Sequence, residues 1–318
     1  MIRPVVFLWL LAVHAFAFAE NRNPDTLPFE VEDHRYFAAE QPTRVLNIAS
    51  SADLALFQSV LTGFQASAPR VAINYFQASS LEVNKAAAAG SGIDLLISSA
   101  MDLQTKLAND GAAQVWRSAA SAALPDWARW RDRVIAFTEE PIVIVANHAA
   151  FDLRSPQTRS ALMNRLREQP ARYRTRLITY DLAASGLAYL LATQDSRNGS
   201  AFWGLTELLG VLDSQFVCCS GEMIDAIVEG RADIAYNVLG SYARQRLSAL
   251  PADHPGFQII EPEDYTLLML RSALIPTSAP SPELAGSFID YLVVFTCLFI
   301  YLLMLSRMAA SVSLTRCT

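Results

Sequence analysis

Three pairs of adjacent serines are the residues of this sequence best suited to binding chemistry. They are Ser50-Ser51, Ser79-Ser80 and Ser98-Ser99. Each pair follows an apolar stretch and precedes a helical pattern. A serine hydroxyl beside the free amides of a helix N-terminus binds anions, whereas a serine attacks a substrate only when a base activates it. The alternative role of each pair is to cap the helix that follows. Three pairs at equivalent positions favour a shared anion-binding pocket.

The serine pairs end three predicted strands, which alternate with two predicted helices. The strands are 44–49, 70–76 and 93–97, and the helices are 53–65 and 81–89. Leu54, Phe57 and Leu61 give the first helix its apolar face. Strands alternating with helices predict a parallel sheet, and such sheets bind ligands beyond the carboxyl ends of their strands. The sequence therefore predicts an α/β fold with the serines at its binding edge.

A second group of small and polar residues follows strands in the later part of the chain. Ser185 and Gly186 start a predicted helix after the strand 176–180. Glycine there lets a backbone amide approach an anion closely. Tyr236 and Asn237 stand at the end of the next predicted strand.

Length, charge and the N-terminus indicate a two-domain protein that works outside the cytoplasm. The chain has 318 residues and a net charge of −6, which indicates neither disorder nor a nucleic-acid surface. Residues 1–19 show the positive start, apolar core and small-residue cleavage site of a signal peptide, with cleavage expected after Ala19. ATP-dependent chemistry is not expected in that location.

The cysteines give no sign of a metal or redox centre. They are Cys218, Cys219, Cys297 and Cys317. Because they lack CxxC or histidine-rich spacing, neither a zinc site nor a redox site is predicted. We expect small, partly buried side chains, with oxidative pairing as the alternative. No cofactor is predicted.

The segment 291–305 is almost wholly apolar, and Arg307 and Arg316 follow it. It is shorter than the roughly 17–20 residues that span a bilayer. Three interpretations remain open. The segment is a membrane anchor with a basic cytoplasmic tail, a buried final helix, or a tail produced by a shift of reading frame.

Four stretches in a fixed order carry a resemblance to a known family. They are Leu46–Ser51, Gly92–Ser99, Thr179–Gly186 and Glu229–Asn237. From about Arg44 to Tyr291 the chain resembles the periplasmic solute-binding proteins of ABC transporters. The branch it resembles includes ferric-iron and phosphorylated-solute binders and the phosphoglycerate transport regulatory binding proteins. The resemblance implies the type II fold, in which each of two lobes is a mixed, mainly parallel sheet flanked by helices, with a cleft between the lobes.

The resemblance also implies how the chain is divided. The expected parts are 1–19 signal peptide, 20–43 lead-in, 44–140 and 240–290 first lobe, 141–239 second lobe, and 291–318 an unassigned apolar segment. The serine pairs would line the first lobe, and Ser185, Gly186, Tyr236 and Asn237 the second. We expect a small anionic organic solute, a phosphate ester or a carboxylate, to bind between them.

Two roles fit such a protein, and the sequence does not choose between them. It presents the solute to the permease of an ABC transporter, or it reports the solute to a membrane sensor kinase of a two-component system that controls uptake. Iron-binding members of the family present adjacent tyrosines, whereas here Tyr236 is followed by Asn237. Ferric iron is therefore not favoured, and no metal ligand is predicted.

Two rival functions come from other classes. A hydrolase would need an activated serine, but Ala184-Ser185-Gly186 lacks the leading glycine of a G-x-S-x-G motif and no histidine is placed nearby. We therefore predict no catalytic residue and no enzyme activity. An interaction module would use the tryptophan-rich segment, which holds Trp116, Trp127 and Trp130. Such residues more often pack at a core or a domain edge.

Overall fold

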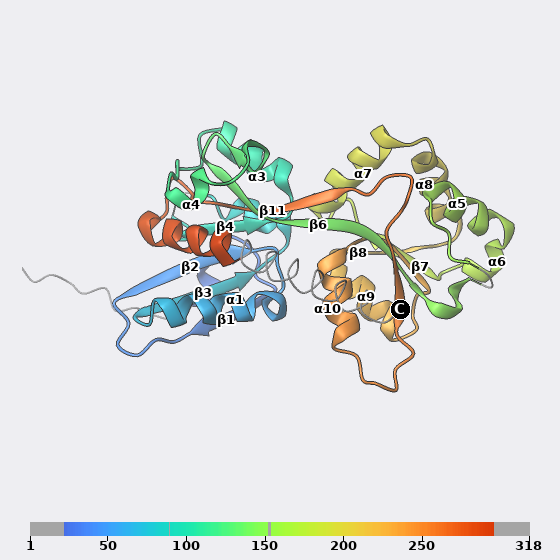
Figure 1. Cartoon of the computed structure of the whole chain (residues 1–318), viewed down its shortest axis with the longest axis horizontal. Helices are drawn as coiled ribbons and strands as arrows, with labels where there is room; N and C mark the ends of the chain where they lie inside the picture. The colour runs from blue at the N-terminus through green and yellow to red at the C-terminus, as the bar shows by residue number, and fades with distance from the viewer. Residues whose placement is uncertain (1–21, 89, 152–153, 296–318) are drawn as a thin grey trace, which may run out of the picture.

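The computed structural model describes residues 22–295, except residues 89 and 152–153 (Figure 1). The predicted signal peptide and residues 296–318 lie outside the described residues.

The first half of the molecule contains the parallel sheet that the sequence predicts. Its strands are β1 (Asp33–Phe37), β2 (Arg44–Ser50), β3 (Val71–Gln77), β4 (Leu95–Ser98) and the two-residue β5 (Arg129–Trp130). The first four lie in the order β1-β3-β2-β4. Strand β2 runs parallel to β3 and to β4. Strand β1 runs antiparallel to β3. The predicted α/β architecture is therefore confirmed.

The helices of this half cover the sheet with apolar faces. They are α1 (Leu54–Ser67), α2 (Ser80–Lys85), α3 (Met101–Asn109), α4 (Ala119–Ala122) and a last helix over residues 282–295, with 3-10 turns at Pro24–Thr26 and Asp126–Ala128. The buried residues of α1, among them Phe57, Leu61 and Phe64, recur at helical spacing. They share one core with Phe288 from the last helix.

The second half repeats the arrangement with its own sheet and core. Its strands are β7 (Leu177–Tyr180), β8 (Gln215–Val217), β9 (Ile234–Leu239) and β10 (Phe257–Ile260), and its helices are α5 (Arg159–Glu168), α6 (Pro170–Tyr173), α7 (Gly186–Asn198), α8 (Ala201–Val211), α9 (Ser220–Val228) and α10 (Gly240–Ser248), with a 3-10 turn at His148–Ala150. Strand β7 lies parallel to both β8 and β9.

Two long strands join the halves and lie side by side in Figure 1. Strand β6 (Val134–Asn147) pairs first with β11 (Leu268–Leu274) and then with β9 and β10. The two apolar runs 134–137 and 142–146 lie in one continuous strand that passes through Pro141. Because β6 and β11 are the strands shared by both halves, they are the natural hinge.

Two parts of the predicted division differ from the structure. The lead-in contains β1, an edge strand whose polar, half-exposed residues gave no periodic signal. Residues 240–290 were assigned wholly to the first lobe, but α10 and β10 pack in the second half. Tyr242, Ala243 and Phe257 are buried in its core, and β10 pairs with the later part of β6.

The start of the apolar C-terminal segment continues the last helix. Leu292 is 1% exposed and Val293 4% exposed, both within the core of the first half. For these residues, burial in the protein agrees with the interpretation as a final helix. Among the residues that the structure describes, no helix is long and apolar enough to cross a membrane.

Candidate functional site

A cavity of about 40 Å³ lies between the two halves, at the carboxyl ends of the parallel strands. It is much smaller than the roughly 300–1,000 Å³ of typical ligand pockets. The conformation is therefore closed, and a solute enters only if the halves separate about β6 and β11.

Five of the predicted site residues line this cavity. They are Ser51, Ser79, Ser80, Ser99 and Ser185. Gly186 lies beside them, because its amide donates a hydrogen bond of 3.0 Å to the Oγ atom of Ser80. The structure thus brings serines of both halves to one place.

Ser50 and Ser98 are buried beneath the cavity rather than in its wall. Their Oγ atoms accept hydrogen bonds of 3.1 Å from the amides of Ala52 and Ala100. They hold the turns after β2 and β4, and their contact with a ligand stays a prediction. In each of these two pairs, the second serine lines the cavity.

Tyr236 and Asn237 also lie away from the cavity. Strand β9 continues to Leu239, so both residues sit within the strand instead of at its end. Leu239, the last residue of β9, lines the cavity in their place. Their predicted position at the strand end is corrected because the strand is longer than its apolar pattern indicated, and their role in binding stays a prediction.

Tyr236 and Asn237 belong to a buried ionic cluster in the second half. Both bond to Asp195, which is fully buried: the Tyr236 hydroxyl donates at 3.0 Å and the Asn237 amide at 2.8 Å. The Nε atom of Arg159 donates to the Tyr236 hydroxyl oxygen at 2.9 Å and lies 3.4 Å from Asp195. Burial, with the negative charge of Asp195, raises the pKa of Tyr236 well above its ordinary value. The cluster engages the Tyr236 hydroxyl and the Asn237 side-chain amide, whereas the Nη2 atom of Arg159 has no hydrogen-bond partner among the described residues.

Sequence reasoning missed several residues of the cavity wall. They are Glu32, Asp53, Tyr180, Cys218, Cys219, Ser220 and Tyr242. Cys218 and Cys219 form a disulfide with each other, which is the oxidative pairing that the sequence left open as the alternative. Asp53, Cys219 and Ser220 stand at helix starts, so a search for every helix N-terminus could have found them.

The N-termini of six helices meet at the cavity. The residues that line it at helix starts are Asp53 of α1, Ser79 of α2, Ser99 before α3, Ser185 of α7, Cys219 of α9 and Leu239 of α10. Each helix N-terminus carries a partial positive charge of roughly half an elementary charge. Their convergence places partial positive charges around the cavity, whose wall also holds the carboxyl groups of Glu32 and Asp53 and, among the described residues, no arginine or lysine.

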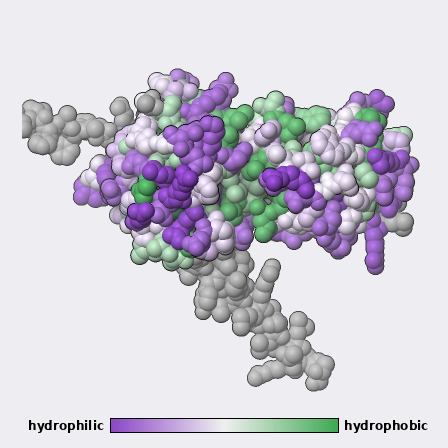
Figure 2. Space-filling view, turned by 90° about the horizontal axis from the view of Figure 1, so that it is seen from above, coloured by the Kyte–Doolittle hydropathy of each residue, from purple (hydrophilic) through white to green (hydrophobic). Residues whose placement is uncertain are grey.

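Direct contacts between the halves hold the closed form. The backbone amide of Asp53 donates to the Tyr242 hydroxyl oxygen at 3.0 Å, and Gln245 donates to the carbonyl of Ala55 at 3.4 Å. Leu56 and Met101 of the first half pack against the second core. Figure 2 shows hydrophobic residues gathered near the middle of one face and hydrophilic residues toward both ends.

Asp53 is a carboxylic acid of the cavity wall whose pKa is clearly shifted. Burial raises the pKa of its carboxyl to about 6, although the positive charge of Arg271 opposes the change. Burial also raises the pKa of Glu32. Near pH 6 the Asp53 carboxyl therefore exchanges between a charged acceptor and a neutral donor.

The raised pKa of Asp53 makes stability depend on pH. The folded protein holds this proton more tightly than the unfolded chain, so its contribution is complete below about pH 4 and is lost as the pH rises through about 6. Asp53→Asn should therefore stabilise the protein by roughly 1–3 kcal/mol at pH 8 and change it little at pH 4. Urea unfolding at both values measures the difference, with the exposed Asp253→Asn as control. Equal effects at the two pH values would contradict this assignment.

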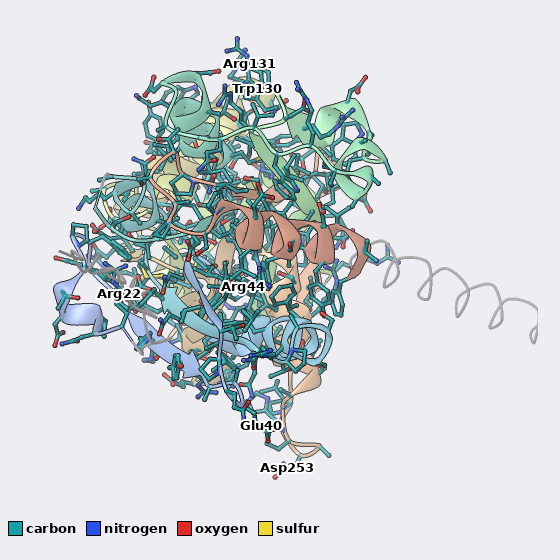
Figure 3. All side chains as sticks on the ribbon, turned by 90° about the vertical axis from the view of Figure 1, so that its left-hand side faces the viewer. Arg22, Glu40, Arg44, Trp130, Arg131 and Asp253 are labelled. Atoms are coloured by element: carbon teal, nitrogen blue, oxygen red, sulfur yellow. A yellow bond between two sulfur atoms is a disulfide. The ribbon has the colours of Figure 1, made fainter. Side chains whose placement is uncertain are left out.

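Two other features were candidates for a site. In Figure 3, Trp130 and Arg131 project from the outer edge of the first half, and the arginine lies 5.5 Å from the tryptophan ring. Trp130 also bonds to Asn109 at 3.0 Å. The tryptophans of this segment do not line the cavity.

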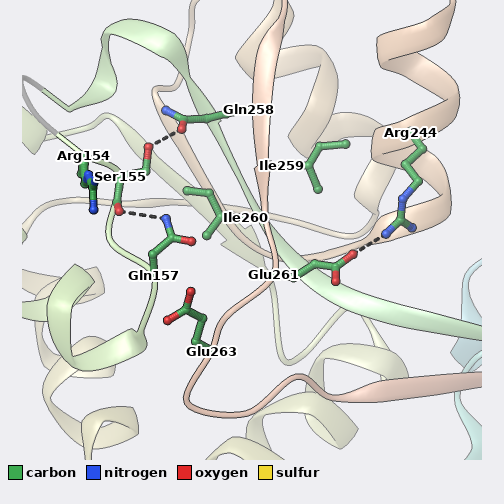
Figure 4. Close-up of a pocket in the computed structure, with 9 residues that line it drawn as sticks. All are labelled: Arg154, Ser155, Gln157, Arg244, Gln258, Ile259, Ile260, Glu261 and Glu263. Atoms are coloured by element: carbon green, nitrogen blue, oxygen red, sulfur yellow. Dashed lines mark hydrogen bonds and ion pairs between the residues drawn. The ribbon is translucent and has the colours of Figure 1, made fainter. Parts of the chain in front are cut away.

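Figure 4 shows an open groove of about 780 Å³ on the second half. Several of its polar groups bond to one another: Arg244 pairs with Glu261 at 2.5 Å, and Ser155 bonds to Gln258. The groove lies beside β10, not at the carboxyl ends of the parallel strands. The cavity between the halves is therefore the stronger candidate.

A two-lobed α/β fold with a cavity between the lobes is typical of solute-binding proteins. Comparison with known proteins gives the family. Residues 46–293 match the family described as bacterial extracellular solute-binding protein, and the chain belongs to that family. The family and the fold are those of binding proteins, not of enzymes. Members are extracytoplasmic and deliver a solute to the permease of an ABC transporter.

Solved structures agree with this assignment. The substrate-binding protein of an ABC transporter from Agrobacterium tumefaciens is 31% identical, with a TM-score of 0.77 over 83% of this chain and 79% of that one. AfuA from Actinobacillus pleuropneumoniae is 15% identical, with a TM-score of 0.65 over 79% of each chain. Iron-bound HitA from Pseudomonas aeruginosa is 15% identical, with a TM-score of 0.61 over 78% of this chain and 80% of that one. No curated protein matches the sequence.

Proposed function

We propose that this protein captures a small anionic organic solute, a phosphate ester or a carboxylate, between its lobes and presents it to an ABC transporter. The observation that carries the proposal is the meeting of six helix N-termini and five serines at one cavity. Hydroxyls and helix N-termini are preferred partners of phosphate and carboxylate groups. The solute is the cargo of the protein, and no catalytic step is part of the proposal.

The lobes of this proposal follow the strand pairing. The first lobe comprises residues 22–141 and 268–295, and the second comprises residues 142–267. Strand β6 changes partners near Pro141, from β11 to β9, which sets the boundary there. Closing the lobes buries the solute, and the permease then recognises the closed form.

The structural relatives include one protein solved with an anionic solute and one solved with iron. The AfuA structure contains exogenous fructose 6-phosphate, and the HitA structure contains iron. For this chain the serines and helix N-termini favour the first chemistry. The hydroxyl of Tyr236, the residue that the resemblance set beside the adjacent tyrosines of iron-binding members, is engaged by Arg159 and Asp195. No histidine lines the cavity, so it provides neither an imidazole ligand nor a histidine base.

Removing one cavity serine from each lobe tests the proposal. Ser51→Ala with Ser185→Ala should lower the affinity for a phosphorylated or carboxylated solute by between about 10-fold and 100-fold. The reason is that each substitution removes a hydroxyl and with it one hydrogen bond to the charged group of the solute. Isothermal titration calorimetry measures the change.

Because Ser185 also caps α7, the control must remove a cap elsewhere. Ser59→Ala with Thr158→Ala removes one exposed serine and the side-chain cap of α5, both outside the cavity. This control should keep full affinity. If both double variants bind alike, the two serines do not contact the solute.

A further inference from the structure

Cys218 and Cys219 lie in the wall of the cavity, between β8 and α9, and are joined by a disulfide. Glu32 reaches them from the other lobe. One ligand atom of each of these three residues lies within 4.8 Å of the others. The Sγ atom of Cys218 is also 3.6 Å from the Oε2 atom of Glu222. Sulfur and carboxylate ligands from both lobes therefore converge at one point.

The two sulfur atoms cannot act as thiolate ligands while they are bonded to each other. A phosphine with water, or a dithiol, reduces the disulfide to two thiols and is itself oxidised to a phosphine oxide or a cyclic disulfide. Two thiolates on one tetrahedral zinc ion lie roughly 3.8 Å apart, given zinc–sulfur bonds of about 2.3 Å. Because the two cysteines are adjacent in the chain, both thiolates can reach one ion once the S–S bond is broken.

We propose that reduction of this disulfide creates a site for a thiophilic divalent cation, such as Cd²⁺ or Zn²⁺, bound by the thiolates of Cys218 and Cys219 and by the carboxylate of Glu32. The cation displaces one proton from each thiol. Cys219 is the N-cap of α9, and the positive end of that helix stabilises a thiolate. Thiolate sulfur selects such soft cations over Mg²⁺ and Ca²⁺.

The three ligands come from different lobes, so a bound cation should affect how the lobes open. Glu32 belongs to the segment before β1 in the first lobe, whereas the cysteines belong to the second lobe. A cation bound to all three joins the lobes across the mouth of the cavity. It should therefore hold the cleft closed and exclude a solute, whatever that solute is.

Redox conditions decide which state is present. Disulfides persist outside the cytoplasm, so the oxidised form, which holds no cation, is the resting state there. A reducing environment creates a metal-binding site in the wall of the solute cavity. This inference does not depend on the identity of the solute.

Cadmium titration of the full chain tests the inference. Cys297 and Cys317 are replaced by serine in every sample, so that the vicinal pair supplies the only thiols. After reduction with a neutral phosphine and its removal, one Cd²⁺ should bind per chain, with an ultraviolet sulfur-to-cadmium charge-transfer band. The oxidised protein should show no band. Cys218→Ser and Cys219→Ser should each weaken binding strongly.

Glu32→Gln distinguishes a site between the lobes from a simple dithiol. It should lower the affinity for cadmium at least about tenfold, because the loss of even a supporting contact to a metal site has an effect of that size. Glu30→Gln, on the same segment but outside the cavity wall, should leave the affinity unchanged. Equal affinities for the Glu32 and Glu30 variants would overturn the proposal. Binding by the oxidised protein, or one cation shared by two chains, would also overturn it.

Discussion

Gly186→Leu should lower the affinity for the solute by at least about 100-fold, because it prevents the lobes from closing. A Cβ atom at Gly186 would lie 2.7 Å from the Cδ1 atom of Leu103 and 3.1 Å from the Oγ atom of Ser80, both on the opposite lobe. A leucine side chain extends further into the same space. Leucine is a good helix former, so α7 itself should still form.

The effect on the shape of the molecule should accompany the effect on affinity. Small-angle X-ray scattering should show a larger radius of gyration for Gly186→Leu than for the unaltered protein with solute. Gly210→Leu, on α8, is the matched control, since nothing lies within 4 Å of a Cβ atom there. It should leave both the affinity and the radius unchanged. Full affinity in Gly186→Leu would mean that binding does not require the closed cleft.

The second large effect concerns stability. Arg159→Met should destabilise the fold by about 3–5 kcal/mol, because it leaves a buried carboxylate without its cation. Arg159 is 1% exposed and lies 3.4 Å from Asp195, which is fully buried, and 3.1 Å from Asp264. Its guanidinium also stacks 3.7 Å from the centre of the Tyr265 ring. Denaturant unfolding measures the loss.

An exposed ion pair supplies the control for this variant. Arg174→Met breaks the ion pair between Arg174, 67% exposed, and Asp213, 53% exposed. It should lower the free energy of unfolding by at most about 1 kcal/mol. Because the buried cluster lies outside the cavity, the folded Arg159→Met protein should still bind solute below its melting temperature. A loss of stability no larger than that of the control would show that the cluster is not a structural anchor.

The parallel sheet of the first lobe was predictable because its signals are local. Strand β2 is followed by an apolar helical face in α1, and the same alternation leads to β3 and β4. The carboxyl ends of parallel strands share one edge, so the approximate place of the site followed from chain order alone. Ser51 and Ser99 lie in the cavity wall for this reason.

The finer placement depends on contacts that no local pattern contains. Which serine of a pair faces the cavity depends on the turn after the strand: Ser50 turns inward to bond the amide of Ala52. The length of β9 depends on its pairing with β6, so Tyr236 and Asn237 fall within the strand. Asp53 faces Tyr242, 189 residues later in the chain, only because the lobes close.

Calorimetric titration with matched pairs of solutes shows whether the protein binds an anionic organic solute. The unaltered protein is titrated with fructose 6-phosphate and fructose, with glycerol 3-phosphate and glycerol, with a dicarboxylate series, and with ferric ion. We expect at least one phosphorylated or carboxylated solute to bind one-to-one, and its neutral partner not to bind. Binding of a neutral solute as tight as that of its charged partner, or of ferric ion alone, would contradict the proposed function.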